Sequence, residues 1–251
     1  MAWYGARWDE LATFLDAARD VWDQSEHELG RGWLMSHLIA LHVAMARDDQ
    51  AAADAATATL HTLLAQEATD EISRLVAAYQ ADDADKLLCP PLAHWTENTS
   101  YPETLMFLSE RGILAPRELL DAAAAEAYVE QVPFPLLYLA IAEALSADDD
   151  ERLAAALEDA EQGGVVAHVA RMRIVLAQLN GDRAQLEQAR PVLQRLGDRQ
   201  FLRRLDEVAS RLQLGAPQPH QVREPEHVAP GAPGAPERAE PRRRVRRATE
   251  V

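Results

Sequence analysis

Paired breaks recur along this chain at a nearly constant interval, and no other feature constrains its fold as much. The breaks are Asp48-Asp49, Asp82-Asp83, Asp148-Asp149 and Gly181-Asp182, and they lie 34, 66 and 33 residues apart. Halving the longest interval predicts another break near residue 115, where Gly112 suits a helix end and Pro116 suits the first position of a following helix. A period of about 34 residues accommodates two helices, so the sequence predicts a chain of helix pairs.

The stretches between these breaks are helical in pattern. Apolar residues recur at helical spacing, and no run of four to eight alternating residues competes with them. The chain has 47 Ala but only 11 Gly and 4 Phe, a composition that favours helices over strands. We therefore predict an all-α fold. The expected helices are 8–23, 31–46, 49–66, 69–81, 83–96, 102–112, 116–130, 134–146, 149–162, 165–179, 183–196 and 199–213.

The acidic residues at the breaks suit the start of a helix. A carboxylate oxygen at that position accepts hydrogen bonds from the free N–H groups of the following helix, and its charge matches the positive end of the helix dipole. The run Asp148-Asp149-Asp150-Glu151 has the composition of a cation site but lacks the spaced ligands of a calcium loop. We interpret these residues as helix caps and predict no metal.

Charge is distributed unevenly along the chain. The net charge is −16, yet residues 215–251 contain seven Arg and five Glu, so residues 1–214 carry −18 and the remainder +2. An acidic body repels nucleic acid and anionic membranes, which makes nucleic acid an unlikely partner and favours a basic protein or the chain's own tail. No apolar run is long enough to cross a membrane and no leader pattern is recognisable, so we expect a cytoplasmic location.

The 34-residue helix pair resembles the tetratricopeptide repeat, in which a Gly-Asp-like turn joins two helices. Before Asp82, the hydrophobic and aromatic positions of a first helix are matched by Ile72, Leu75, Val76 and Tyr79. The turn at Gly181 is followed by second-helix positions matched by Leu186 and Ala189. A similar turn into a second helix is formed by Ala6, Arg7, Trp8, Asp9, Glu10 and Leu11.

The resemblance implies a right-handed superhelical α-solenoid of about twelve antiparallel helices over residues 1–214. The solenoid would begin with an unpaired second helix at 8–23 and close with a capping helix at 199–213. A tail over 215–251 holds 7 of the chain's 14 prolines and should be disordered.

A second resemblance concerns the last helices. Residues 188–198 followed by helix 199–213 are similar to the end of the tetratricopeptide-like arms in large bacterial signalling ATPases. Those arms follow an ATPase module and are joined to LuxR-type DNA-binding or nucleotide-cyclase domains. The resemblance implies an accessory or remnant sensor arm of such a regulator, as an alternative to an independent scaffold.

Solenoids bind peptides or helices of other proteins on a concave surface lined by first helices, here 31–46, 69–81, 102–112, 134–146 and 165–179. We therefore expect a protein or peptide in this groove, although each polar side chain there could equally be part of a solvated helix face. The polar candidates are His37, His42, Arg74, Glu110, Arg111, Glu143, His168, Arg171 and Arg173, and the binding residues that we favour are Arg74, Tyr79, His168, Arg171 and Arg173.

Two further segments are candidates for interaction. Aromatic residues cluster at the N-terminal edge, where we expect a surface for homodimer formation; they include Trp3, Tyr4, Trp8 and Trp22. The tail carries a basic run of Arg242, Arg243, Arg244, Arg246 and Arg247, which could bind nucleic acid weakly, anchor another protein, lie on the acidic body or serve only solubility.

No catalytic constellation is recognisable in the sequence. Cys89 and His94 lack an orienting third group, and a single cysteine cannot form an intramolecular disulfide. His37 and His42 are five residues apart and do not share a helix face as zinc ligands would. The glycine-containing stretches lack the residues of a phosphate-binding loop. We predict a non-catalytic protein-binding module without a cofactor.

Overall fold

A computed structural model describes residues 7–24, 30–66, 70–83, 101–130 and 133–213 of the protein. Every regular element in these ranges is helical. The elements are η1 (Trp8–Glu10), α1 (Leu11–Gln24), α2 (Gly30–Ala46), α3 (Gln50–Gln66), α4 (Asp70–Ala81), α6 (Tyr101–Glu110), α7 (Arg117–Glu130), α8 (Pro133–Ser146), α9 (Asp150–Gln162), α10 (Val166–Asn180), α11 (Arg183–Leu196) and α12 (Arg199–Gln213).

The all-α prediction is confirmed for the described residues. The expected helix at 8–23 begins as the short 3₁₀ helix η1 before α1, and the other predicted helices that can be compared end within two residues of the observed bounds. The expected helix at 83–96 lies, apart from its first residue, outside the described residues, as does the tail at 215–251.

The breaks that set the 34-residue period are helix ends of one type. Asp48, Asp82 and Asp148 adopt left-handed φ values of 56°, 49° and 52°. After each of them the next residue donates its N–H back to a buried alanine carbonyl, as in a Schellman motif, and the three N···O distances are 2.9 Å (Asp49 to Ala44), 3.1 Å (Asp83 to Ala78) and 3.3 Å (Asp149 to Ala144).

The predicted break near 115 has the same geometry with glycine in place of aspartate. Gly112 has a φ of 69°, and the N–H of Ile113 lies 3.0 Å from the carbonyl oxygen of Leu108. Glycine accepts the left-handed region without a steric cost, whereas an L-residue with a Cβ is strained there. The period read from the sequence therefore corresponds to recurring helix ends.

Capping by the second residue of the break is confirmed at three of the breaks. The Asp49 carboxylate accepts a hydrogen bond from the N–H of Ala52 at 3.1 Å, and that of Asp149 accepts one from Arg152 at 2.9 Å. Asp182 caps α11 through the N–H of Ala184 at 2.9 Å. In the pairs at 48–49 and 148–149, the first aspartate therefore ends one helix and the second begins the next.

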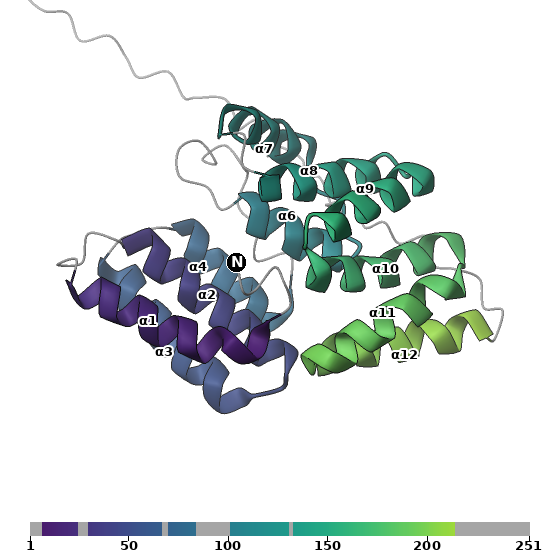
Figure 1. Cartoon of the computed structure of the whole chain (residues 1–251). Helices are drawn as coiled ribbons and strands as arrows, with labels where there is room; N and C mark the ends of the chain where they lie inside the picture. Colours follow the sequence, from purple (N-terminus) through teal and green to yellow (C-terminus); the bar gives the residue numbers. More distant parts are fainter. Residues whose placement is uncertain (1–6, 25–29, 67–69, 84–100, 131–132, 214–251) are drawn as a thin grey trace, which may run out of the picture.

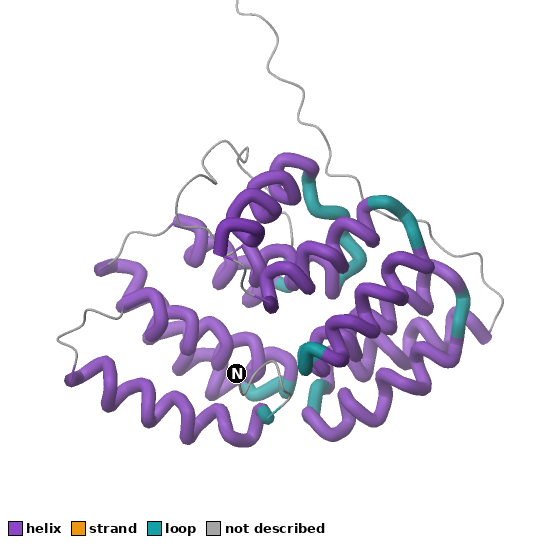
Figure 2. Tube along the Cα trace, turned by 45° about the horizontal axis from the view of Figure 1, so that its top comes forward, coloured by secondary structure: helices purple, strands orange, loops and turns teal. Residues whose placement is uncertain are grey.

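The helices form three groups around a common centre (Figure 1). Helices α1–α4 make one group, α6–α9 a second, and α10–α12 a third. Within and between the groups, α2 packs on α3, α8 on α9, α10 on both α9 and α6, and α11 on α10 and α12. Helix α12 also contacts α2, so the last described helix touches the first group (Figure 2).

The contact between α2 and the last helices is polar at its rim. The Arg47 Nε donates to the carbonyl oxygen of Leu196 at 3.0 Å, and Arg203 forms a two-pronged ion pair with Asp48 across 155 residues of sequence. Apolar packing continues behind this rim, because one hydrophobic core extends from η1 to the end of α11 and a second lies among α10, α11 and α12.

Candidate functional site

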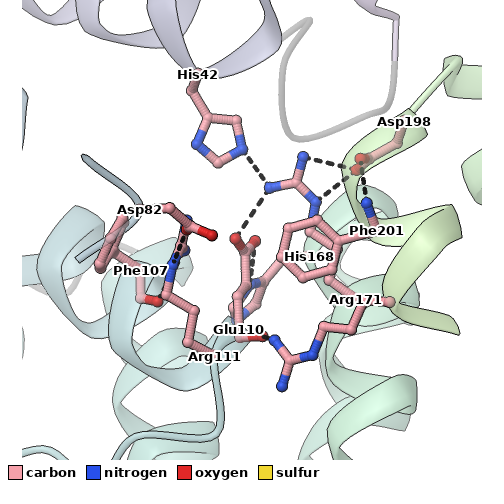
Figure 3. Close-up of polar contacts among 10 residues, drawn as sticks. His42, Asp82, Phe107, Glu110, Arg111, His168, Arg171, Asp198 and Phe201 are labelled. Atoms are coloured by element: carbon pink, nitrogen blue, oxygen red, sulfur yellow. Dashed lines mark hydrogen bonds and ion pairs between the residues drawn. The ribbon is translucent and has the colours of Figure 1, made fainter. Parts of the chain in front are cut away.

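Charged and polar side chains meet at the centre where the three groups join (Figure 3). His42 comes from α2, Glu110 from the end of α6, Arg171 from α10, and Asp198 from the turn between α11 and α12. All four residues are at most 5% exposed. Four segments that are distant in sequence thus place their polar groups in a single buried cluster, which we call the central network.

Arg171 is the hub of the central network. Its Nη1 donates to Oε2 of Glu110 at 2.9 Å, and its Nε donates to Oδ2 of Asp198 at 2.8 Å. The same Nη1 also contacts Nε2 of His42, and the second oxygen of Glu110 lies 3.0 Å from Nδ1 of His168. One guanidinium thereby joins two carboxylates and an imidazole, the arrangement that the planar donors of arginine favour.

Burial and charge together set the protonation states in the network. Burial alone would raise the pKa of Glu110, but the charge of Arg171 and the hydrogen bond from His168 hold it below its ordinary value. Burial lowers the pKa of His42 well below 6.5, and the neighbouring Arg171 lowers it further. A neutral imidazole is also what the contact requires, because Nε2 of His42 must accept from the guanidinium.

Aromatic rings close the network on two sides. The guanidinium carbon of Arg171 lies 4.5 Å from the ring centre of Phe201 and 5.3 Å from that of Trp8. Tyr79 packs edge-on against His42 at 4.8 Å, and Tyr138 against His168 at 4.9 Å. Since rings favour a cation on their faces, these contacts enclose Arg171 and keep water away from it.

The position of Trp8 corrects one sequence prediction. We expected Trp8 on an exposed N-terminal edge, but its side chain is only 3% exposed because η1 inserts it over Arg171. The Asp9 carboxylate beside it accepts from Arg47 at 2.7 Å, which ties η1 to the end of α2. Of the other residues predicted for this edge, Trp3 and Tyr4 lie outside the described residues and the side chain of Trp22 is likewise not described.

The predicted groove residues also require correction. Tyr79, His168 and Arg171 are 4%, 3% and 1% exposed, so these side chains contact the chain's own helices and not a surface open to a partner. These side chains are buried because the three helix groups pack against one another around them. Arg74 and Arg173 are partly exposed, and Arg173 pairs with Glu161 at 2.7 Å and with Gln185 at 2.8 Å.

Sequence reasoning brought most of the network together but missed one member. His42, Glu110, His168 and Arg171 all belong to predicted first helices and were expected to line one concave surface, but the structure buries them together between the helix groups. Asp198 was not expected there; the only signal was Gly197-Asp198, a further copy of the Gly-Asp turn, in which Asp198 caps α12 through the N–H of Phe201 at 3.1 Å. The tail arginines 242–247 lie outside the described residues.

An apolar stripe lies exposed on α1. Among the described residues, the most exposed large hydrophobic side chains are Phe14 and Val21, at 45% and 52%. They are seven residues apart, with exposed Ala17 between them, so all three lie on one side of the helix. Asp20 borders this stripe, which we call the α1 face, and Leu11 on the opposite side of α1 is buried.

A groove lies on the outer side of the last helix pair. It encloses about 320 Å³ between α11 and α12, and residues of both helices line it: Arg183, Leu186, Glu187, Arg190, Pro191, Gln194, Ala209 and Gln213. Leu186, Pro191 and Ala209 make part of its wall apolar. The groove follows α11 from Arg183 to Gln194 and reaches α12 only at Ala209 and Gln213, whereas Arg203, which pairs with Asp48 after α2, lies nearer the other end of α12.

Searches of protein-family models, curated proteins and solved structures find no match to this chain. In the part of the chain that the structure describes, no three His, Cys, Asp or Glu side chains are grouped so as to hold a metal ion. None of the described helices is long and apolar enough to span a membrane.

Proposed function

We propose that the protein is a non-catalytic helical scaffold that binds another protein through the α1 face. The observation that carries this proposal is the exposure of Phe14 and Val21 on one side of a helix at the outer edge of the molecule. Isolated exposed hydrophobic residues are common, but two large ones aligned with a small residue between them form a stripe suited to a partner.

The state of the central network supports an outer binding surface. Glu110, His168 and Arg171 are each at most 3% exposed and have one another, Asp198 and His42 as partners. A ligand could reach these groups only by breaking ion pairs that are costly to separate in a buried setting. The network is therefore better suited to holding the helix groups in place than to binding or catalysis.

The recurring helix ends supply a second line of support. Helix pairs repeated at about 34 residues form arrays in which each pair contacts its neighbours, and such arrays act by presenting surface. In a tetratricopeptide-like array, the first and last helices have faces without a neighbouring repeat. Among the described residues, helix α1 packs mainly against α2, which leaves its other side open to a partner.

Site-specific photo-crosslinking in cells tests the proposal. A photoreactive amino acid is placed at Phe14 and, in a second variant, at Val21, with exposed Arg117 on α7 as the control position. We expect a discrete protein adduct from positions 14 and 21 that is absent from position 117. An adduct at all three positions, or at none, would contradict binding through α1.

A further inference from the structure

We infer that the partner of the α1 face is a second copy of this chain, and that α1 docks into the groove between α11 and α12 of that copy. This inference rests on the proposed function, because it names the partner of the same surface. The contact joins two different faces, so each copy uses its α1 face toward one neighbour and its groove toward another.

The two faces match in apolar character. Phe14, Ala17 and Val21 offer a narrow ridge of two large side chains and one small one. The groove offers Leu186, Pro191 and Ala209 as an apolar floor, and its volume of about 320 Å³ is well above the space needed for a water molecule. A ridge on one helix that packs between two others is the ordinary geometry of helix packing.

The two faces also match in charge. Residues 8–24 contain five acidic residues and one arginine, whereas the lining of the groove contains two arginines, Arg183 and Arg190, and one acidic residue, Glu187. At the contact itself, exposed Asp20 borders the α1 face and Arg183 lines the groove, and in the part of the chain that is described neither carries an ion pair. Opposite charges on two surfaces of one chain favour pairing of unlike faces and oppose pairing of α1 with α1.

The placement of the faces permits this contact. In both general views, α1 lies at one side of the molecule and the far ends of α11 and α12 lie at the other (Figures 1 and 2). Faces on opposite sides leave room for a second copy at each. Association of unlike faces is heterologous and generates a ring or an open filament.

Two blocked variants test the inference. The head variant, Phe14→Gln with Val21→Gln, removes the apolar ridge and keeps good helix formers. The groove variant, Arg183→Glu with Gln194→Glu, reverses the charge at one exposed position of the groove and adds a negative charge at another. Arg117→Gln on α7 is the matched control. The mass of each protein is measured by light scattering over a range of concentrations, and circular dichroism verifies the helix content.

We expect the wild type and the control to exceed the monomer mass of 27.8 kDa as concentration rises. Each blocked variant alone should stay at the monomer mass, with association weakened about tenfold or more. A mixture of the two should give a complex of two chains, because the head variant retains its groove and the groove variant retains its α1 face. A charge exchange adds a second test: Asp20→Arg should weaken association, and mixing it with Arg183→Glu should restore it.

The alternatives give different results. If the groove variant alone still forms dimers that the head variant does not, α1 pairs with itself; the inference fails and protein binding by α1 stands. If the wild type is monomeric at every concentration while photo-crosslinking at Phe14 captures a different protein, the inference fails and the proposed function again stands. If neither assay detects a contact at α1, both fail.

Discussion

The central network and the polar rim between α2 and α12 both hold distant helices together by arginine–carboxylate pairs, but in different surroundings. Arg171 binds Glu110 and Asp198 with about 1% of each side chain exposed. Arg203 binds Asp48 nearby, with 60% and 39% of the two side chains exposed. Charges in water gain little by pairing, whereas buried charges depend on their partners. The contribution of an arginine to the stability of this fold therefore depends on how deeply its ion pair is buried.

The largest effect on stability is expected from a substitution that removes the hub of the central network. Arg171→Met leaves the carboxylates of Glu110 and Asp198 buried without their cation, which should lower the free energy of unfolding by about 3–5 kcal/mol. Urea unfolding monitored by circular dichroism measures the change. Adding Glu110→Gln to Arg171→Met should recover part of the loss, because one unpaired charge is then removed. Equal losses for the single and double variants would contradict this account.

The next effect uses pH to compare His42 of the central network with His37, a buried histidine outside it. Burial and Arg171 lower the pKa of His42, and burial with Arg19 lowers that of His37. Below about pH 6.5 the unfolded chain therefore binds protons that the folded chain does not, and stability falls as the solution is acidified. The slope approaches about 1.4 kcal/mol per pH unit for each such group.

Urea unfolding at pH 7.5, 6.5 and 5.5 measures this slope. His42→Gln keeps a hydrogen-bond acceptor for Arg171 and should reduce the loss between pH 6.5 and 5.5, and His37→Gln should reduce its own share. A wild type that is equally stable at the three pH values would show that neither histidine is held neutral by the fold.

The third effect compares two turns with the same backbone. Asp148 and Asp82 both have left-handed φ values, but Asp82 accepts hydrogen bonds from Arg111 while no ion pair or hydrogen bond of the Asp148 carboxylate appears among the described residues. Asp148→Gly should raise stability by about 0.5–1 kcal/mol, because glycine relieves the strain. Asp82→Gly should gain less or nothing, since it also loses the pair with Arg111. Thermal unfolding of both variants checks the contrast, and equal shifts would contradict it.

The smallest effect is expected at the rim. Arg203→Gln removes the exposed pair with Asp48, whose hydrogen bond from Arg203 lowers the pKa of Asp48. We expect a loss below about 1 kcal/mol that shrinks further in concentrated salt. A loss comparable to that of Arg171→Met would mean that the rim and the central network contribute alike.

Local features of the fold were predictable from the sequence because they depend on neighbouring residues. Asp49, Asp149 and Asp182 cap helices whose starts they mark in the sequence, and Gly112 ends a helix where the period required a break. The helix bounds followed from the same signals, since capping and apolar spacing act within one or two turns.

The site was less predictable because it depends on contacts between distant segments. The polar faces of the first helices were identified, but nothing local indicates that Glu110 and Arg171 would be buried against each other across 61 residues. Trp8 was expected at an exposed edge for the same reason, because its burial requires α10 to lie beneath η1. Phe14 and Val21 could be recognised as an open face only after the structure showed which side of α1 packs on α2.

The long sequence separation within the central network also affects when the fold is completed. Arg171 contacts His42 across 129 residues and Asp198 across 27, so the cluster cannot be complete until Asp198 has been synthesised. Helices α2 and α6 leave the ribosome much earlier, with His42 and Glu110 still solvated. Contacts between segments that are distant in sequence form slowly. We therefore expect the N-terminal helices to remain partly assembled until the network forms around Arg171, and this step to limit the folding rate.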